Sequence, residues 1–482
     1  MAETDPSSTG HSRPASSSAE AAPHPGSAGT VSGSDAAEAA DGRLKLSVIW
    51  SFTLSRVAFS IMGVMFSVYL MKYATDVLLI APATMGILIA AARLWDGVTD
   101  PLVGYLSDRT RSRIGRRRIW LYASALPMAV GIIMIWSPPG DLSGYWLIAW
   151  MAIALLVYET ASTAYLIPHG ALGMELTPNY HERTRLFGYA HMIGFLGSII
   201  GMGTLQLMTM ADDKRGFAFD LSVVAAIIVF LAVVITTRFL PERSDYQGRG
   251  NQSVIRSVLD VFKNPHARLL LIVFAIETYG IASIMTLTPY LVAYVFPLEA
   301  YLVAVMMTYA LPQVIFTPFW MWLARRVGKQ KAWTGALMLS ALPFIGFYFL
   351  AEPGWLFWVL TFFCGFLAGC GAVAQPAIQA DVIDYDELTT GDRKEGAYLA
   401  VWNLIRKSSA SLCALITGLV LQYSGFEPNQ VQSEQTVEAI RTIFGLLPAA
   451  CYVVGGLLFT RFAFNEAEHA AARATIASRT EA

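Results

Sequence analysis

Three charged side chains interrupt an apolar stretch of 26 residues that runs from Pro82 to Ser107. They are Arg93, Asp96 and Asp100. In a helix, Asp96 and Asp100 share one face, and Arg93 lies one turn before Asp96. A charge at the depth of a bilayer costs at least ~2.5–3.5 kcal/mol on insertion scales, so such residues usually face a cavity or a partner and mark the path of an ion or a substrate.

Two carboxylates one turn apart repel each other when both are ionised in a medium of low dielectric. A bound monovalent cation or a shared proton would relieve this repulsion, and the hydroxyl groups of Thr99 and Thr163 could complete an oxygen cage. The alternative is permanent neutralisation, of Asp96 by Arg93 and of Asp100 by a basic residue elsewhere. The spacing favours a cation site at Asp96 and Asp100.

Lys407 lies inside an apolar stretch of the second half of the chain, next to Arg406. If it faces Asp96 and Asp100 from the other half, Lys407 forms an electrostatic latch between the halves. The alternative is that it extends to the membrane surface, because two adjacent basic residues cannot both face one cavity. The residues alone leave both interpretations open.

Isolated polar residues in other apolar stretches could line a central cavity or form hydrogen bonds between helices; they are Arg56, Glu159, His191 and Glu277. Aromatic residues near these positions could stack on a sugar ring or serve packing alone; they are Tyr158, Tyr165, Tyr398 and Trp402. From this set we predict four substrate-binding residues: Arg56, Glu159, His191 and Trp402.

The elements that carry these residues are predicted to be membrane-spanning helices. Of the 482 residues, 55% are hydrophobic and only 14% are charged, whereas a soluble domain has roughly 25% charged residues. Apolar runs of spanning length lie at about 47–74, 81–106, 119–137, 144–167, 186–210, 217–240, 267–295, 300–323, 332–351, 355–379, 397–422 and 437–462. The sequence therefore predicts an all-α membrane protein with twelve transmembrane helices in two six-helix bundles.

A polar linker, 241–266, separates the predicted bundles, which we place at 45–240 and 267–463. Residues 1–44 are rich in Ser, Ala, Gly and Pro and predict a disordered tail. Residues 464–482 predict a second polar tail. Because basic residues concentrate in alternate loops, the positive-inside rule places both tails in the cytoplasm.

Six arginines follow the second predicted helix: Arg109, Arg111, Arg113, Arg116, Arg117 and Arg118. A looser copy of this basic loop, Arg325-Arg326-Val327-Gly328-Lys329, follows the eighth. The repetition suggests a transporter with a pseudo-two-fold axis, although basic inner loops alone leave a receptor, an enzyme or a channel open. We expect Asp108, Arg109 and Arg116 to pair with neighbouring helix ends as a gate; a solvated topology signal is the alternative.

Other classes of function find no support in the sequence. It contains no GxSxG, Walker or HExxH motif, which argues against an enzyme. The four cysteines lie in apolar stretches without a CxxC pair, so no disulfide framework and no metal site beyond the cation site is indicated. The net charge of −1 gives no indication of a nucleic-acid partner.

Four stretches, at 69–76, 93–115, 168–183 and 381–396, carry a resemblance to a known family. Two of them read Tyr69-Leu70-Met71-Lys72-Tyr73-Ala74-Thr75-Asp76 and Asp381-Val382-Ile383-Asp384-Tyr385-Asp386-Glu387. Over about 45–462 the chain resembles the glycoside–pentoside–hexuronide:cation symporter family, the melibiose permease group of the major facilitator superfamily.

The resemblance implies alternating access, with an organic solute coupled to Na⁺ or H⁺ and no cofactor. It carries the family's cation site onto Asp96 and Asp100, with Thr99 and Thr163 as oxygen donors. It also carries the family's lysine of the eleventh helix onto Lys407, and we expect Lys407 and Arg93 to couple the cation to the solute.

The family's sugar-binding positions carry other residue types here: Phe59 or Ser60, Leu166 and His191. The loss of two acids that hold sugar hydroxyls argues against a galactoside. Arg56, Arg93 and His191 favour an anionic solute such as a hexuronate.

The resemblance thus predicts a symporter of a sugar, glycoside or hexuronide, as a monomer in the bacterial inner membrane. Its partners would be a small organic solute and the lipid bilayer. The alternatives are a transporter of a lysolipid or other amphipathic solute, a solute exporter, and a membrane receptor without transport.

Overall fold

The computed structural model describes residues 43–177, 180–242, 261–390 and 395–462. Within these ranges the regular elements are helices. Helices suit long apolar runs, because each backbone N–H and C=O finds its partner inside the same segment. The predicted tails and most of the predicted linker lie outside the described residues.

The first half of the chain contains α2 (Leu46–Val64), the π-helical turn η1 (Met65–Tyr69), α3 (Leu70–Asp76), α4 (Pro82–Arg109), α5 (Arg118–Trp136), α6 (Gly144–Glu175), α7 (Tyr180–Met210) and α8 (Lys214–Phe239). The second half contains α10 (Pro265–Tyr290), η3 (Leu291–Val295), η4 (Glu299–Tyr301), α11 (Leu302–Ile315), α12 (Thr317–Val327), α13 (Lys329–Phe349), α14 (Trp355–Thr390), α15 (Glu395–Tyr423), α16 (Glu434–Arg441), η5 (Thr442–Leu446) and α17 (Leu447–Phe459).

Ten helical segments of the described chain are long and apolar enough to cross a membrane. The pair of η4–α11 and α12, bent by 47°, would make an eleventh. Each of the twelve apolar runs in the sequence overlaps a helix, but α4, which carries Arg93, Asp96 and Asp100, is not among these candidates. The number of twelve spans therefore stays a prediction.

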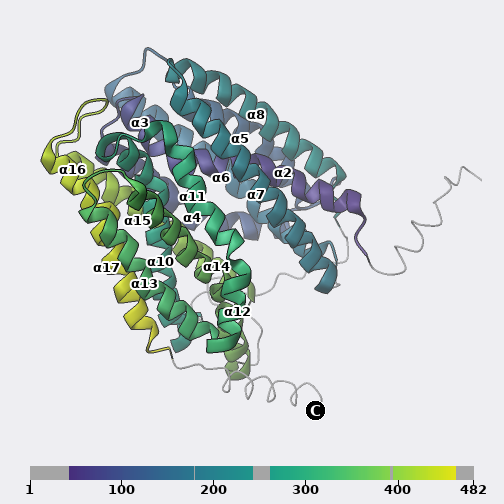
Figure 1. Cartoon of the computed structure of the whole chain (residues 1–482). Helices are drawn as coiled ribbons and strands as arrows, with labels where there is room; N and C mark the ends of the chain where they lie inside the picture. The colour runs from purple at the N-terminus through teal and green to yellow at the C-terminus, as the bar shows by residue number, and fades with distance from the viewer. Residues whose placement is uncertain (1–42, 178–179, 243–260, 391–394, 463–482) are drawn as a thin grey trace, which may run out of the picture. The chain divides into compact units, whose positions relative to one another are not determined.

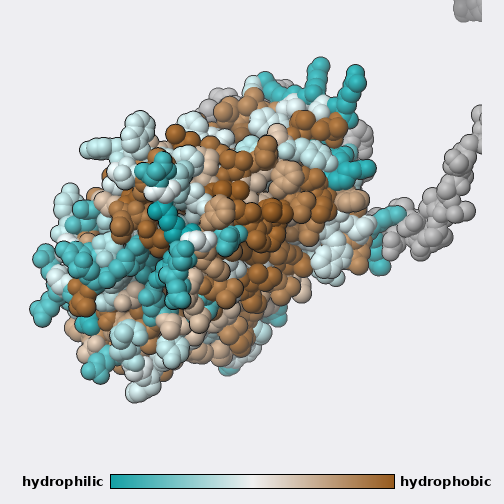
Figure 2. Space-filling model, turned by 90° about the horizontal axis from the view of Figure 1, so that it is seen from above, coloured by the Kyte–Doolittle hydropathy of each residue, from teal (hydrophilic) through white to brown (hydrophobic). Residues whose placement is uncertain are grey.

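Apolar side chains also cover much of the surface. Figure 2 shows a broad brown area with teal side chains on either side of it. Exposed apolar residues recur at helical spacing along α4, α7 and α8; examples are Leu94, Val98, Leu102, Leu196, Ile200, Leu207, Val224, Ile227 and Leu231. Water-soluble monomers rarely expose apolar patches beyond a few hundred Å², so this surface fits a lipid environment.

Each half packs mainly within itself. In the first half α2 packs on α7 and α8, α5 on α6 and α8, and α4 on α6. In the second half α10 packs on α15 and α17, α13 on α14 and α17, and α11 on α14. The main contact between the halves joins α4 to α15, and smaller ones join η1 to α10 and α7 to α11.

Glycines permit the closest helix contacts. A Cβ on Gly86 of α4 would lie 2.8 Å from the carbonyl oxygen of Ala414 on α15. A Cβ on Gly418 of α15 would meet the carbonyl oxygen of Pro82. Small residues at such crossings allow backbones to pack where lipid gives no hydrophobic drive for association.

The tenth predicted helix continues past its expected end. The apolar run stops near residue 379, which predicts that the acidic residues after it lie in a loop, but α14 extends to Thr390. Asp381, Asp384, Asp386 and Glu387 are therefore helical. The run 377–390 contains no Gly or Pro to end the helix. The ammonium of Lys329 pairs with Asp381 and offsets part of the acidic charge.

Candidate functional site

α4 carries three of the charges that the sequence predicts at membrane depth, Arg93, Asp96 and Asp100. It begins at Pro82, where a missing N–H is tolerated, and continues for 28 residues to Arg109. Asp96 and Thr99 are buried on the face that packs against the rest of the protein. Pro101 lies inside the helix; because proline has no N–H, the carbonyl of Gly97 loses its usual helical partner. The acids therefore have an additional backbone acceptor near them.

Lys407 of α15 contacts both acids of α4. Its Nζ lies 2.7 Å from Oδ2 of Asp100, to which it donates a hydrogen bond. The same Nζ lies 3.1 Å from Oδ2 of Asp96. The structure therefore places Lys407 across the interface between the halves, in the position of a latch.

Asp96 and Asp100 differ in their surroundings. Asp96 is fully buried, and neither of its carboxylate oxygens accepts a hydrogen bond from the described residues. Its ion pair with Lys407 is close in distance but not aligned for hydrogen bonding. Asp100 is partly exposed and accepts a hydrogen bond from Thr163 Oγ1 at 2.8 Å. Thr99 directs its hydroxyl at the carbonyl of Trp95 on its own helix, at 3.2 Å.

Arg93 bridges two acids. Its Nη1 lies 3.0 Å from Oε1 of Glu159 on α6 and 3.6 Å from Oδ2 of Asp96. Glu159 is buried.

We refer to Arg93, Asp96, Asp100, Glu159 and Lys407 as the central charge cluster. It holds three carboxylates and two cationic groups, so with every member ionised its charge sums to −1.

The other predicted substrate residues are not part of this cluster. Arg56 on α2 and His191 on α7 are exposed. Trp402 on α15 is buried with its ring 5.4 Å from that of Tyr398, and its Nε1 has no acceptor among the described residues. Glu277 of α10 lies inside the second half, where Trp333 and Gln375 donate hydrogen bonds to it.

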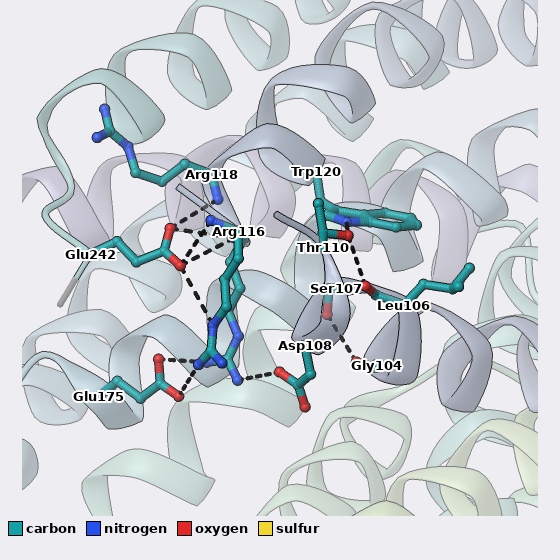
Figure 3. A network of polar contacts seen from close by, with 11 residues as sticks. Gly104, Leu106, Ser107, Asp108, Thr110, Arg116, Arg118, Trp120, Glu175 and Glu242 are labelled. Carbon is teal, nitrogen blue, oxygen red and sulfur yellow. Dashed lines mark hydrogen bonds and ion pairs between the residues drawn. The ribbon is translucent and has the colours of Figure 1, made fainter. Parts of the chain in front are cut away.

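Two of the three predicted gate residues, Asp108 and Arg116, lie in a network at the end of the helices that carries the basic loops (Figure 3). Arg117 Nη2 donates to Asp108 at 2.6 Å, and its Nη1 lies 2.9 Å from Glu175 at the end of α6. Arg116 Nη2 donates to Glu175 at 2.8 Å. Glu242 accepts from the backbone N–H groups of Arg116, Arg117 and Arg118. These bonds join elements of the first half.

Arg109 lies apart from these bonds. It is exposed, and its guanidinium lies 4.1 Å from the ring centroid of Tyr105, one turn earlier on α4. The second half contains an equivalent of the Arg116–Glu175 pair, because Lys329 at the start of α13 pairs with Asp381 near the end of α14. This correspondence is what a repeated bundle would give.

A second network lies at the opposite end of the helices, which we call the distal end. Lys72 of α3 is buried and donates to Asp76 Oδ2 at 2.5 Å. It also lies 3.4 Å from Glu299 of η4 and 5.0 Å from the ring centroid of Tyr294. Tyr294 itself donates to Asp76 Oδ2 at 2.6 Å.

Two further contacts at the distal end join residues of the first half to residues of the second. Thr75 Oγ1 and the hydroxyl of Tyr290 lie 2.8 Å apart. Asn429, between α15 and α16, donates through Nδ2 to the carbonyl of Asp76 at 2.8 Å. We call Lys72, Thr75, Asp76, Tyr290, Tyr294, Glu299 and Asn429 the distal network. It joins the two halves, and its only signal in the sequence is the stretch 69–76, which by itself indicates no role.

Comparison with known proteins identifies the family. The model of the MFS/sugar transport protein family matches residues 51–466. The chain belongs to this family. The resemblance to the glycoside–pentoside–hexuronide:cation symporters is thereby confirmed, and the protein is an integral membrane transporter and not an enzyme.

Curated relatives cover most of the chain. The inner membrane symporter YicJ of Escherichia coli is 24% identical over 82% of this chain and 86% of its own. The isoprimeverose transporter of Lactiplantibacillus pentosus is 26% identical over 83% and 85%. The sodium-dependent lysophosphatidylcholine symporter 1 of Xenopus tropicalis is 21% identical over 88% and 89%.

The fold is shared with solved transporter structures. The crystal structure of the nucleoside transporter NupG superposes with a TM-score of 0.63 at 14% identity, over 87% of this chain and 99% of that one. At 14% identity, the similarity to NupG is evidence for a shared fold.

Proposed function

We propose that this transporter is a cation-coupled symporter that moves a sugar, glycoside or hexuronide by alternating access. The central charge cluster carries the proposal. Its three carboxylates and two cationic groups sum to −1 at membrane depth, where an uncompensated charge is costly. One Na⁺ or one proton makes the cluster neutral, so the cluster suits a single monovalent cation.

The ion would sit between Asp96 and Asp100. The carboxylate of Asp96 accepts no hydrogen bond from the described residues and so keeps its lone pairs for an ion. Thr99, Thr163 and the carbonyl of Gly97 supply further oxygen atoms in the immediate surroundings. Hard monovalent and divalent cations prefer such oxygen ligands.

The orientation follows from the basic loops. Both termini and the Arg116–Glu175 network would face the cytoplasm, and the distal network would face outside, with α4 as a twelfth span. The protein would then act as a monomer in the bacterial inner membrane, in a state in which contacts between the halves close the outer side.

Lys407 couples the ion to the movement of the halves. It comes from the second half and neutralises acids of the first, so a cation that takes its place at Asp96 weakens this contact between α4 and α15. The change alters the balance between the two orientations of the carrier and thereby the affinity for solute. Coupling is reciprocal: if the cation tightens solute binding, the solute tightens cation binding by the same factor.

Gradient-driven uptake tests the proposal. Purified protein in proteoliposomes is supplied with candidate sugars, glycosides and uronides under an imposed Na⁺ or pH gradient. We expect one gradient to drive accumulation above equilibrium, and Asp96→Asn or Asp100→Asn to abolish it, because each removes one of the two charges that attract the ion.

The exposed Asp220 of α8 provides a matched control, since Asp220→Asn makes the same chemical change away from the cluster. Unchanged accumulation in both cluster variants would contradict the cation site. Downhill exchange that persists without accumulation is the expected behaviour of an uncoupled carrier.

A lysolipid is the second candidate solute. The support is the relative from Xenopus tropicalis, which its name describes as a sodium-dependent lysophosphatidylcholine symporter and which matches 88% of the chain. Uptake of a short-chain lysophosphatidylcholine, measured beside the sugars in the same vesicles, distinguishes the two solute classes.

The distal network yields a prediction about the balance of conformations. Tyr294→Phe removes the hydroxyl that donates to Asp76 and accepts from the N–H of Asn429. A hydrogen bond to a charged group is worth about 1.5–3 kcal/mol. If this bond exists only with the outer side closed, its loss shifts the population toward the outward-open state by roughly tenfold to a hundredfold.

Spin labels on Tyr145→Cys and Val431→Cys report this shift, because both residues are exposed, one in each half near the distal end. We expect the population with the longer distance between labels to grow in Tyr294→Phe. Tyr301→Phe, at an exposed tyrosine of the same end, is the control. Distance distributions that match in all three proteins would show that the hydroxyl does not hold the outer side closed.

A further inference from the structure

Within the described parts of the chain, two arginines from opposite halves lack the carboxylate partners that Arg93 and Lys407 have. They are Arg56 of α2 and Arg406 of α15. Both side chains are exposed, and both lie roughly three turns after the start of their helices. Among the described residues neither forms an ion pair with a carboxylate. Arg93 of α4, by contrast, forms an ion pair with Glu159.

Arg56 lies beside α7 at the point where Gly194 leaves room for it. Its Cγ lies 4.0 Å from the position that a Cβ would take on Gly194 of α7. Its charge acts electrostatically on Tyr165 and His169 of α6 and on Arg406 of the other half. Arg56 therefore lies beside α7 and within electrostatic range of groups on α6 and α15.

Arg406 points away from the central charge cluster. The neighbouring Lys407 binds Asp96 and Asp100, and successive residues of a helix differ by about 100° in direction. The guanidinium of Arg406 donates from Nη2 to Oδ1 of Asn403 on its own helix, at 2.5 Å. This neutral contact orients the group without neutralising it.

The two guanidinium groups therefore repel each other across the interface between the halves. A charged group at membrane depth is costly unless it is paired, and a guanidinium is the side chain best suited to bind carboxylate or phosphate. Two such groups, one on each half and both exposed, form an arrangement that an anionic ligand would stabilise.

We propose that Arg56 and Arg406 together bind an anionic group, a carboxylate or a phosphate, on the transported solute. This inference rests on the proposed function and specifies, in addition, that the transported solute carries an anionic group. The anion turns repulsion between α2 and α15 into attraction to a shared partner. Occupancy of this site therefore draws α2 and α15 together around a loaded solute, whereas the two cationic groups repel each other when the site is empty.

Binding to the purified full-length protein, without a gradient, tests the site. The probes are phenyl-β-D-glucuronide, the neutral phenyl-β-D-glucoside, inorganic phosphate and a short-chain lysophosphatidylcholine. Thermal shift measures binding, and the rate at which phenylglyoxal modifies Arg56 and Arg406 measures their protection. The glucuronide and the lysolipid separate a sugar-borne carboxylate from a lipid-borne phosphate.

We expect the glucuronide, through its carboxylate, or the lysolipid, through the phosphate of its zwitterionic headgroup, to bind at least tenfold more tightly than the neutral glucoside and to slow modification of both arginines. Arg56→Gln and Arg406→Gln each remove this preference, and Arg56→Lys retains part of it because the charge remains. Arg113→Gln, at an exposed arginine of the basic loop, leaves it intact.

Three results overturn the proposal: equal or tighter binding of the neutral glucoside, an anion preference that survives both Gln variants, and no effect of any anion on melting or on modification. Because no gradient is used, these failures are distinguishable from a failure of cation coupling, which appears only in the uptake assay.

Discussion

Replacement of Lys407 by Met is expected to reduce gradient-driven uptake by more than about tenfold and to make the protein's thermal stability depend more strongly on Na⁺ than in the wild type. The wild-type ammonium lies within 3.1 Å of Asp96 and 2.7 Å of Asp100. Its removal leaves the central charge cluster with a net charge of −2. Removing one partner of a buried ion pair costs about 3–5 kcal/mol, and a bound cation then recovers part of this loss.

The measurement is a melting curve with and without Na⁺, paired with uptake in proteoliposomes. We expect the melting temperature without Na⁺ to fall by several degrees and the stabilisation by Na⁺ to exceed that of the wild type. The double variant Lys407→Met/Asp100→Asn restores the charge of −1 and is expected to recover stability but not coupling. Lys331→Met, at an exposed lysine, is the control; an equal fall there would assign the effect to loss of a surface charge.

The second large effect is expected at the glycine contact between α4 and α15. A side chain at Gly418 would meet the carbonyl of Pro82, and its Cβ would lie 3.2 Å from Cα of Gly86. Because these are backbone atoms of the other half, rotation of a side chain cannot relieve the overlap. Gly418→Leu is therefore expected to hold the halves apart at the distal end and to abolish net transport.

The fold itself is expected to survive this change, because the overlap disappears once the halves separate. Overpacking that cannot relax costs about 1–3 kcal/mol or more, enough to depopulate the outward-closed state. Spin labels at Tyr145 and Val431 would then report the longer distance as the main population. A Gly418→Leu protein that transports normally would show that this contact is not required.

Leu substitutions at two other glycines serve as controls, because they test whether the effect of Gly418→Leu comes from the contact between the halves. A Cβ added to Gly203 of α7 would have no neighbouring atom within 4 Å, so Gly203→Leu is expected to be tolerated. Gly365 of α14 lies against the carbonyl of Tyr309 in the same half, and opening of the halves does not relieve that overlap. Gly365→Leu is therefore expected to lower the melting temperature, unlike Gly418→Leu.

Much of the architecture is accessible from the sequence, because helix formation in lipid depends on local apolar length. Each predicted run overlaps a helix, and the family resemblance through 93–115 and 381–396 is confirmed. The predicted end of the tenth helix is wrong, because hydropathy marks where a segment leaves the membrane and not where its backbone hydrogen bonds stop. Residues 380–390 are largely polar and helical together.

Other features have a weaker signal or none. In the sequence Arg406 stands out only as the neighbour of Lys407, and its lack of a carboxylate partner among the described residues depends on where the acids of other helices lie. The distal network has one recognisable signal, the stretch 69–76, but its partners Tyr294, Glu299 and Asn429 come from the other half. Nothing in their own neighbourhood indicates that they meet Asp76.

The segments that are apolar enough to span a membrane, and those among them that carry charge, can be identified from the sequence because both properties are local. How these charges pair depends on the packing of the helices. Thr163 reaches Asp100 over 63 positions along the chain, and Lys407 reaches it over 307. Electrostatic pairing depends on distance in space, and the packing of α4 against α6 and α15 sets that distance.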